Sequence, residues 1–132
     1  MRTPKRIQRK RAKGWRMPPF TVFVGRPGLL GNPYLVERWG REKAVLLYRL
    51  AGDGSWDPSA LADLSNEDYH EVYVARQRWH ARVRARTNLT PKEWAQLSLG
   101  GSDVACWCPL DESCHADVLL EWANPKGGGN LS

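Results

Sequence analysis

Short apolar stretches alternate with turn-forming residues along this chain, and two of the stretches have the composition of buried strands. Residues 21–24 read Thr-Val-Phe-Val and stop at a Gly-Arg-Pro-Gly segment. Residues 103–107 read Asp-Val-Ala-Cys-Trp, and a proline follows two residues later. β-Branched and aromatic residues are enriched in strands, whereas glycine and proline usually end them. The pattern therefore predicts two buried strands, at 21–24 and 103–107.

Between these strands, apolar positions recur at the three- and four-residue spacing of helices. One helix is predicted from about Arg41 to Ala51. A longer helix begins after Ser65, whose hydroxyl can cap it. Thr90 begins a third helix, because threonine at the N-cap with proline and glutamate at the first and third positions is a strong helix start. The longer helix carries an apolar stripe made of Tyr69, Val72, Tyr73, Trp79 and Val83.

A last helix is expected near the C-terminus, from about Cys114 to Ala123, with Ser113 as its cap. Asn124 and Pro125 end it. Two buried strands separated by helices favour a parallel pair joined by a helical crossover. We therefore predict a small α/β or α+β domain, with both strands in one parallel sheet and a C-terminal helix beside it.

Charge is unevenly distributed, and it suggests a basic N-terminal arm. The formal net charge is +6, and the first 16 residues hold eight of the 20 Lys and Arg residues and no Asp or Glu. We therefore divide the chain into an arm at 1–16, a single domain at 17–124 and a flexible tail at 125–132. A basic arm favours contact with nucleic acid or another polyanion, although a disordered solubilising tail has the same composition. The candidate nucleic-acid contacts are Lys5, Arg6, Arg9, Lys10, Arg11, Lys13 and Arg16.

Length and composition exclude several classes of protein. A chain of 132 residues is long enough to bury a core without disulfides. No apolar run approaches the ~18 residues of a membrane span, and no apolar stretch of the secretory type follows the basic N-terminus. Three cysteines are an odd number, so a disulfide framework is not expected. We expect a cytoplasmic protein without membrane contact.

Both predicted strands are followed by residues suited to binding a ligand. In open α/β sheets, ligands bind beyond the carboxyl ends of the strands, and parallel strands bring these ends to one edge. Glycine after the first strand allows close approach to the backbone, and arginine offers a planar fork for phosphate or carboxylate. We therefore predict a pocket for a small anion such as a nucleotide, formed by Arg26 and the Cys106–His115 cluster. The candidate ligand-binding residues are Gly25, Arg26, Gly31 and Asn32. A tight turn with an exposed arginine is the simpler alternative.

All three cysteines fall within nine residues near the C-terminus, and three interpretations of them stay open. In the first, Cys106, Cys108 and Cys114 bind zinc, because thiolates are good zinc ligands. Structural zinc takes four ligands, however, and this spacing is not that of a standard zinc finger. A fourth ligand would come from one of the three histidines, His115, His80 or His70.

In the second interpretation a cysteine is reactive. Cys114 is predicted in the first turn of a helix, where the dipole lowers the pKa of a thiol, so Cys114 with His115 as its base is a candidate catalytic pair. Asp111 and Glu112 would raise the pKa of the same thiol. In the third interpretation the cysteines are small buried side chains that pack the strand against the helix. The sequence does not decide whether the protein is an enzyme, and zinc is the only cofactor that it suggests.

Three motifs resemble an uncharacterised domain-of-unknown-function family of bacteria and their phages. They are RIQRKRAKGWRMP at the N-terminus, VFVGRP with GNPY behind it, and ACWCPLDESCHADVLLEWAN. The resemblance implies a phage or bacterial setting and supplies no activity.

Two functional hypotheses follow from the residues and the resemblance. In the first, the protein is linked to nucleotides or nucleic acid and binds its ligand in the predicted pocket. In the second, it is a non-catalytic binding module whose basic arm contacts nucleic acid or a host protein. In this second hypothesis the cysteines only stabilise the fold, with or without zinc.

Overall fold

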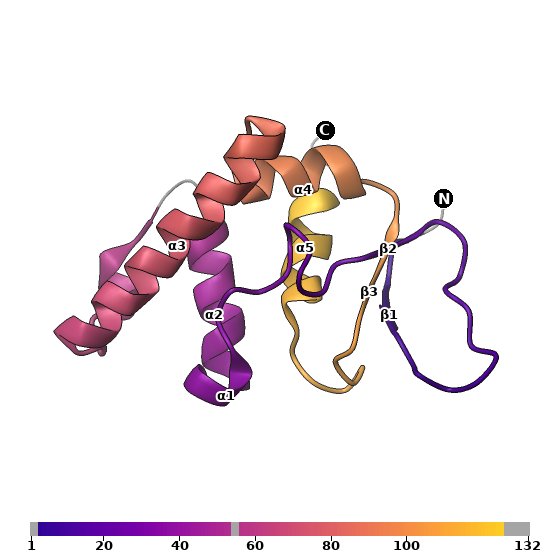
Figure 1. The fold of residues 1–132 in the computed structure, drawn as a ribbon, viewed down its shortest axis with the longest axis horizontal. Coiled ribbons are helices and arrows are strands. Elements are labelled where there is room, and N and C mark those ends of the chain that lie inside the picture. The colour runs from indigo at the N-terminus through magenta and orange to yellow at the C-terminus, as the bar shows by residue number, and fades with distance from the viewer. Residues whose placement is uncertain (1–2, 54–55, 126–132) are drawn as a thin grey trace.

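The computed structural model describes residues 3–53 and 56–125, which form an α+β fold of five α-helices beside a small parallel sheet (Figure 1). In chain order the elements are β1 (Arg6–Gln8), β2 (Thr21–Phe23), α1 (Val36–Trp39), α2 (Arg41–Gly52), the 3-10 helix η1 (Pro58–Leu61), α3 (Asn66–Thr87), α4 (Pro91–Leu99), β3 (Asp103–Cys106) and α5 (His115–Ala123). Figure 1 shows α3 along one side of the molecule, α2 and α5 in the middle, and the strands on the other side. The predicted class is thus confirmed as α+β.

The sheet has the strand order β1-β3-β2, and both pairs of neighbours are parallel. The strands β2 and β3 confirm the two predicted strands, although β2 ends at Phe23 and β3 at Cys106, each one residue early. The helices α1 to α4 form the predicted crossover between them. All four residues of β3 are buried, because this strand is the central one and has a neighbour on each side.

The sequence pattern does not predict β1, which lies within the segment assigned to a basic arm. Its residues Arg-Ile-Gln lack the composition of a buried strand, and all three are only partly buried. The pairing depends instead on backbone groups. The N–H of Val104 donates to the carbonyl of Lys5 (3.1 Å), and the N–H of Arg9 donates to the carbonyl of Cys106 (2.7 Å). The first part of the arm is therefore anchored in the sheet.

The predicted C-terminal helix, α5, lies against the sheet and also contacts α2 and α4. Its Trp122 belongs to a buried aromatic group centred on Tyr48. The ring of Tyr48 lies 4.7 Å from that of Trp79 on α3 and 5.6 Å from that of Trp122, measured between centroids. Trp79 confirms the predicted stripe of α3, whereas Tyr73 of the same stripe is 41% exposed. The core thus joins α2, α3 and α5 around one tyrosine ring.

Side chains cap the helices whose starts the sequence marks most clearly. Ser65 caps α3, and Thr90 caps α4 in a capping box, both as predicted. The expected cap of α5, Ser113, is wrong by one residue. Cys114 takes that position, and its Sγ accepts a hydrogen bond from the N–H of Ala116 (3.5 Å). One of the three cysteines therefore also fixes the start of a helix.

None of the helices in the described part of the chain combines the length and the apolar character of a membrane span. The predicted tail at 125–132 lies outside the described residues apart from Pro125.

Candidate functional site

A cavity of about 270 Å³ opens where β2 and β3 end, and the turns that follow both strands line it. Residues from the two predicted clusters meet there, because parallel strands carry their carboxyl ends to the same edge of a sheet. From the predicted set, the lining contains Gly25, Arg26, Asn32, Cys106, Cys108, Cys114 and His115. The structure thus brings the glycine-arginine turn and the cysteines to one space.

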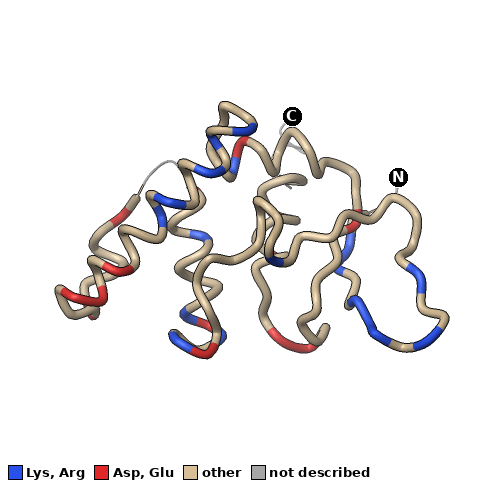
Figure 2. Tube along the Cα trace, viewed as in Figure 1, with Lys and Arg blue, Asp and Glu red and all other residues tan. Residues whose placement is uncertain are grey.

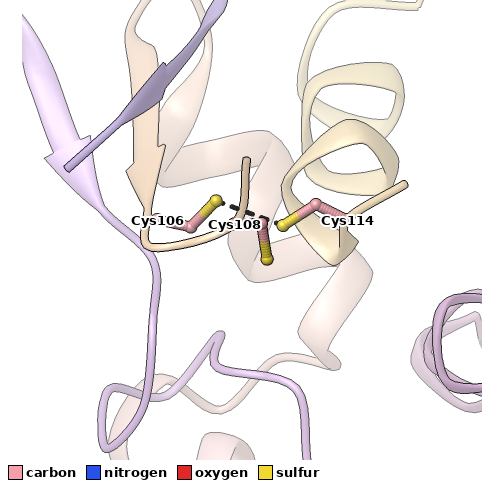
Figure 3. Close-up of side chains that lie close together, drawn as sticks. All are labelled: Cys106, Cys108 and Cys114. Carbon is pink, nitrogen blue, oxygen red and sulfur yellow. Dashed lines mark hydrogen bonds between the residues drawn. The ribbon is translucent and has the colours of Figure 1, made fainter. Parts of the chain in front are cut away.

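The three cysteine side chains come together from three different places in the fold, and those of Cys106 and Cys114 point toward each other (Figure 3). Cys106 ends β3, Cys108 lies in the turn that follows, and Cys114 caps α5. All three Sγ atoms lie within 4.8 Å of one another, and those of Cys106 and Cys114 share a hydrogen bond at 3.1 Å. None of the three forms a disulfide. Cys106 and Cys114 are buried, and Cys108 is partly exposed.

Arg6 of β1 lies on one side of this cysteine cluster, and its side chain is only 8% exposed. Its guanidinium donates from Nη2 to the carbonyls of Leu110 and Glu112, and its Nε lies 3.2 Å from a carboxylate oxygen of Asp117. The remaining nitrogen, Nη1, is buried and has no hydrogen-bond partner among the described residues. Burial lowers the pKa of Arg6, but the net shift is upward because Asp117 and the nearby cysteines stabilise its charge. Arg6 thus supplies a buried positive charge to the cluster.

Arg41, the first residue of α2, also lies beside the cysteine cluster. Its Nη1 donates to the carbonyl of Ser113 (3.0 Å), and its Nε pairs with the carboxylate of Glu112 (2.9 Å). Burial lowers the pKa of Arg41, but its neighbours, foremost a hydrogen bond with Cys108, raise it overall. Arg41 therefore places a second positive charge next to the partly exposed sulfur.

The three thiols differ in acidity because they share hydrogen bonds. Hydrogen bonds from Cys106 and Cys114 lower the pKa of Cys108 to about 2, and Arg41 adds to this effect. The hydrogen bonds with the other two sulfurs raise the pKa of Cys114, and its burial raises it further. Cys108 is therefore the most acidic thiol of the cluster. The expected effect of the helix dipole on Cys114 is outweighed by its sulfur neighbours.

His115 connects the cluster to the end of β2. Its Nε2 donates to the carbonyl of Val24 (2.8 Å), so in the neutral ring Nδ1 carries the lone pair. That nitrogen lies 3.5 Å from the Sγ of Cys114. Burial lowers the pKa of His115, which keeps the imidazole neutral. The histidine is thus held in one orientation, with its basic nitrogen toward a sulfur.

The cavity residues that follow β2, from Gly25 to Asn32, differ in what they offer a ligand. Arg26 is exposed, and its guanidinium makes no hydrogen bond or ion pair with the described residues. The amide of Asn32 is committed to the fold, because it donates to the carbonyl of Ala44 (3.1 Å) and accepts from the N–H of Tyr34 (2.8 Å). A Cβ on Gly31 would lie 2.8 Å from the backbone nitrogen of Arg26, so glycine is needed there for the chain to pack closely against this turn. Gly31 does not line the cavity.

Sequence comparison places the chain in a family. Residues 7–125 match the family model described as "Domain of unknown function (DUF4326)". The chain belongs to this family. The match extends from β1 through the end of α5, so the whole cavity lies inside the DUF4326 domain. None of the curated proteins and none of the solved structures matches the chain. The bacterial and phage setting that the motifs imply stays a prediction.

The basic N-terminal segment borders the cavity of the DUF4326 domain. The guanidinium groups of Arg9 and Arg11 lie 5.0 and 4.4 Å from the ring centroid of Trp107, which lines the cavity. Figure 2 shows basic residues along the loop between β1 and β2. Arg6 differs from the rest of the predicted nucleic-acid contacts, because it is turned into the cysteine cluster. The exposed members of that set are Lys5, Lys10, Arg11, Lys13 and Arg16.

Three residues of this site are not evident from the sequence. Arg6 and Arg41 read as ordinary surface charges, and only the pairing of β1 and the packing of α2 bring them to the sulfurs. Trp107 is one of seven tryptophans, and its position after a predicted strand is the one signal that could have singled it out. Conversely, His80 is bonded to the carbonyl of Ala51 on α2 and does not belong to the described cysteine cluster.

Proposed function

We propose that the DUF4326 domain of this chain binds a small anionic ligand of the nucleotide class in the cavity between the Arg26 turn and the cysteine cluster. The observation that carries the proposal is the guanidinium of Arg26, which has no hydrogen-bond or ion-pair partner in the described part of the chain and lies on the rim of a cavity that it shares with Trp107. Arginine holds a phosphate through two parallel hydrogen bonds, and an exposed aromatic ring offers a face on which a base can stack. Trp107 is 39% exposed, so a base would reach its ring beside the guanidinium groups of Arg9 and Arg11.

The size of the cavity limits the ligand. Its volume of about 270 Å³ is close to the lower end of the ~300–1,000 Å³ range of small-molecule sites. That volume suits a nucleoside mono- or diphosphate and is too small for a dinucleotide. If the cysteines act on the ligand, Cys108 is better placed than the predicted pair of Cys114 and His115, because Cys114 is buried and holds its proton more strongly.

Calorimetric titration of the full chain with nucleoside mono- and diphosphates, and with inorganic phosphate alone, tests this proposal. Loss of a charge-assisted hydrogen bond costs ~1.5–3 kcal/mol, so Arg26→Ala should weaken binding by about 10- to 100-fold. The matched control is Arg78→Ala, which removes an exposed arginine from α3 and leaves the same net charge. Phosphate binding alone would separate an anion site from a nucleotide site. The proposal fails if no nucleotide binds, or if the two variants bind it equally.

A second candidate function, contact with nucleic acid, is favoured by the position of the basic loop. Its arginines lie against Trp107, and lysines and a further arginine project from the same loop. Deleting residues 1–16 would not test this contact cleanly, because the deletion removes β1 and Arg6. Three exposed basic side chains can be changed to glutamine instead, namely Lys10, Lys13 and Arg16.

The readout is the salt dependence of DNA binding. Each phosphate contact contributes about 0.9 to the slope of log K against log salt for duplex DNA, so losing three contacts lowers the slope by up to about 2.7. The control carries glutamine at three exposed arginines of α3, Arg78, Arg82 and Arg86. Equal slopes for the wild type and the loop variant would rule out the loop as the contact.

A further inference from the structure

The cysteine cluster has a geometry that neither anion binding nor simple packing requires. Three sulfurs from a strand end, a turn and a helix cap lie close together (Figure 3). Buried cysteines that only fill space have no reason to meet in threes, because each can pack against any apolar neighbour. We propose that Cys106, Cys108 and Cys114 bind one zinc ion through three thiolates, with the fourth coordination position left to water or to a ligand in the cavity.

Distances between the sulfurs fit one small ion. A tetrahedral zinc site with Zn–S bonds of about 2.3 Å places its sulfurs about 3.8 Å apart. All three Sγ atoms lie within 4.8 Å of one another, and those of Cys106 and Cys114 are 3.1 Å apart. Shifts of less than about 1 Å would therefore bring all three to zinc geometry. A disulfide between Cys106 and Cys114 would leave the third sulfur, that of Cys108, without a role in the cluster.

Charges around the sulfurs also suit a thiolate-metal centre. Three thiolates and a divalent ion carry a net charge of −1, and two guanidinium groups, those of Arg6 and Arg41, lie beside them. The Nη1 of Arg6 is a buried donor that lacks a hydrogen-bond partner among the described residues. Buried donors are nearly always satisfied, and a metal-bound thiolate is an acceptor of the right charge. This unpartnered group is an observation independent of the distances.

Coordination by three protein ligands follows from what surrounds the cluster. The described cluster of possible ligand atoms contains the three cysteines and no histidine or carboxylate. His115 approaches Cys114 closely, but its ring is held by the carbonyl of Val24 and acts as a neighbour of the ligands. Zinc sites with three protein ligands and one open position are typical of catalytic zinc, whereas structural sites are closed by a fourth. The cysteines line the same cavity as Arg26, so the open position and the anion pocket share one space.

The test measures metal content and coordination in the full chain. Elemental analysis of protein purified without chelators should give about one zinc per chain. Titration with Co²⁺ should produce an intense near-ultraviolet charge-transfer band from cobalt-bound thiolates, and zinc should displace it. Zinc should also slow alkylation of all three thiols. Cys108→Ser should lower the zinc affinity by more than about 100-fold, which exceeds the effect of losing an outer-shell partner.

Two controls keep the result interpretable. Cys108 is the partly exposed cysteine, so its serine variant should keep the near-ultraviolet circular dichroism of the wild type, and it is preferred to variants of the buried pair, which would place a hydroxyl in the core. Ser113→Ala changes an exposed neighbour and should keep full zinc affinity. Arg26→Ala should also bind zinc normally, so a failure of nucleotide binding and a failure of zinc binding can be told apart. The proposal is overturned if the wild type gives no thiolate–cobalt band and no zinc protection, if Cys108→Ser binds zinc as well as the wild type, or if mass spectrometry shows a Cys106–Cys114 disulfide under reducing conditions.

Discussion

Replacing Arg6 with methionine should destabilise the fold, because this side chain holds the last loop against the sheet. The guanidinium donates to the carbonyls of Leu110 and Glu112 (3.0 and 2.7 Å) and pairs with Asp117. Methionine keeps most of the apolar stem of the side chain and removes only these contacts. The variant therefore isolates the contribution of the charged group from that of packing.

The expected loss is modest because the partners of Arg6 are themselves close to water. Hydrogen bonds to charged groups contribute ~1.5–3 kcal/mol when buried, but these carbonyls belong to exposed residues and can bind water, so we assign about 1 kcal/mol to each. Asp117 is 48% exposed, and such an ion pair contributes about 0.5 kcal/mol. The variant also removes Nη1, a buried donor without a partner among the described residues, and this gain of about 1 kcal/mol offsets part of the loss. The net loss should be about 1.5 kcal/mol.

Equilibrium urea unfolding, followed by tryptophan fluorescence in the presence of a chelator, measures this loss without any contribution from metal. For a chain of 132 residues, the same loss should lower the Tm by about 6 °C. Arg26→Met is the matched control, because Arg26 has no hydrogen bond or ion pair with the described residues, and it should stay within about 0.5 kcal/mol of the wild type. A stability of Arg6→Met equal to that of the control would refute the assigned role of Arg6.

Three further predictions concern the fold. Burial lowers the pKa of His80 in the folded protein, so as the pH falls the unfolded state binds a proton first. The contribution of the neutral His80 to folding stability should therefore be fully present above about pH 6.5 and be lost as the pH drops below it. His80→Gln should flatten this part of the stability–pH curve. Thr90→Ala removes the cap of α4 and should cost about 1 kcal/mol in urea unfolding, and a loss near zero would show that the helix start needs no cap. Gly52→Ala should lower the free energy of unfolding by ~1–3 kcal/mol, because the new Cβ would lie 2.2 Å from the indole of Trp122. The control Gly100→Ala, whose Cβ would have no atom nearer than 3.6 Å, should unfold at the same urea concentration as the wild type.

Features that depend on neighbouring residues are predictable from this sequence. The two apolar strands carry their signal in a few consecutive residues, and so do the capped starts at Ser65 and Thr90. The parallel pairing of β2 and β3 follows from the helices between them. Since both strands end in unusual residues, the meeting of the Arg26 turn with the cysteines could be anticipated from the topology alone.

Features that depend on distant partners could not be predicted. The strand β1 pairs through its backbone, so its polar side chains conceal it. The amide of Asn32 looks free in the sequence but is used by the backbone at Ala44 and Tyr34. Ser113 is the usual type of cap, yet the sulfur beside it takes that position. For β1 and Asn32, the decisive partners, Val104 and Ala44, lie outside the sequence window that suggests the interpretation, whereas the cap of α5 is decided locally between two adjacent residues.

The middle position of β3 has a consequence for the order of events during synthesis. Arg6 contacts carbonyls that lie 104 and 106 residues further along the chain, so the first strand leaves the ribosome long before its partner exists. Contacts of such separation form late, since a long loop must close first. A nascent chain that stops before Asp103 therefore contains the segments of β1 and β2 but lacks β3, the strand that pairs with both. The sheet and the cavity are completed only when the final quarter of the polypeptide emerges.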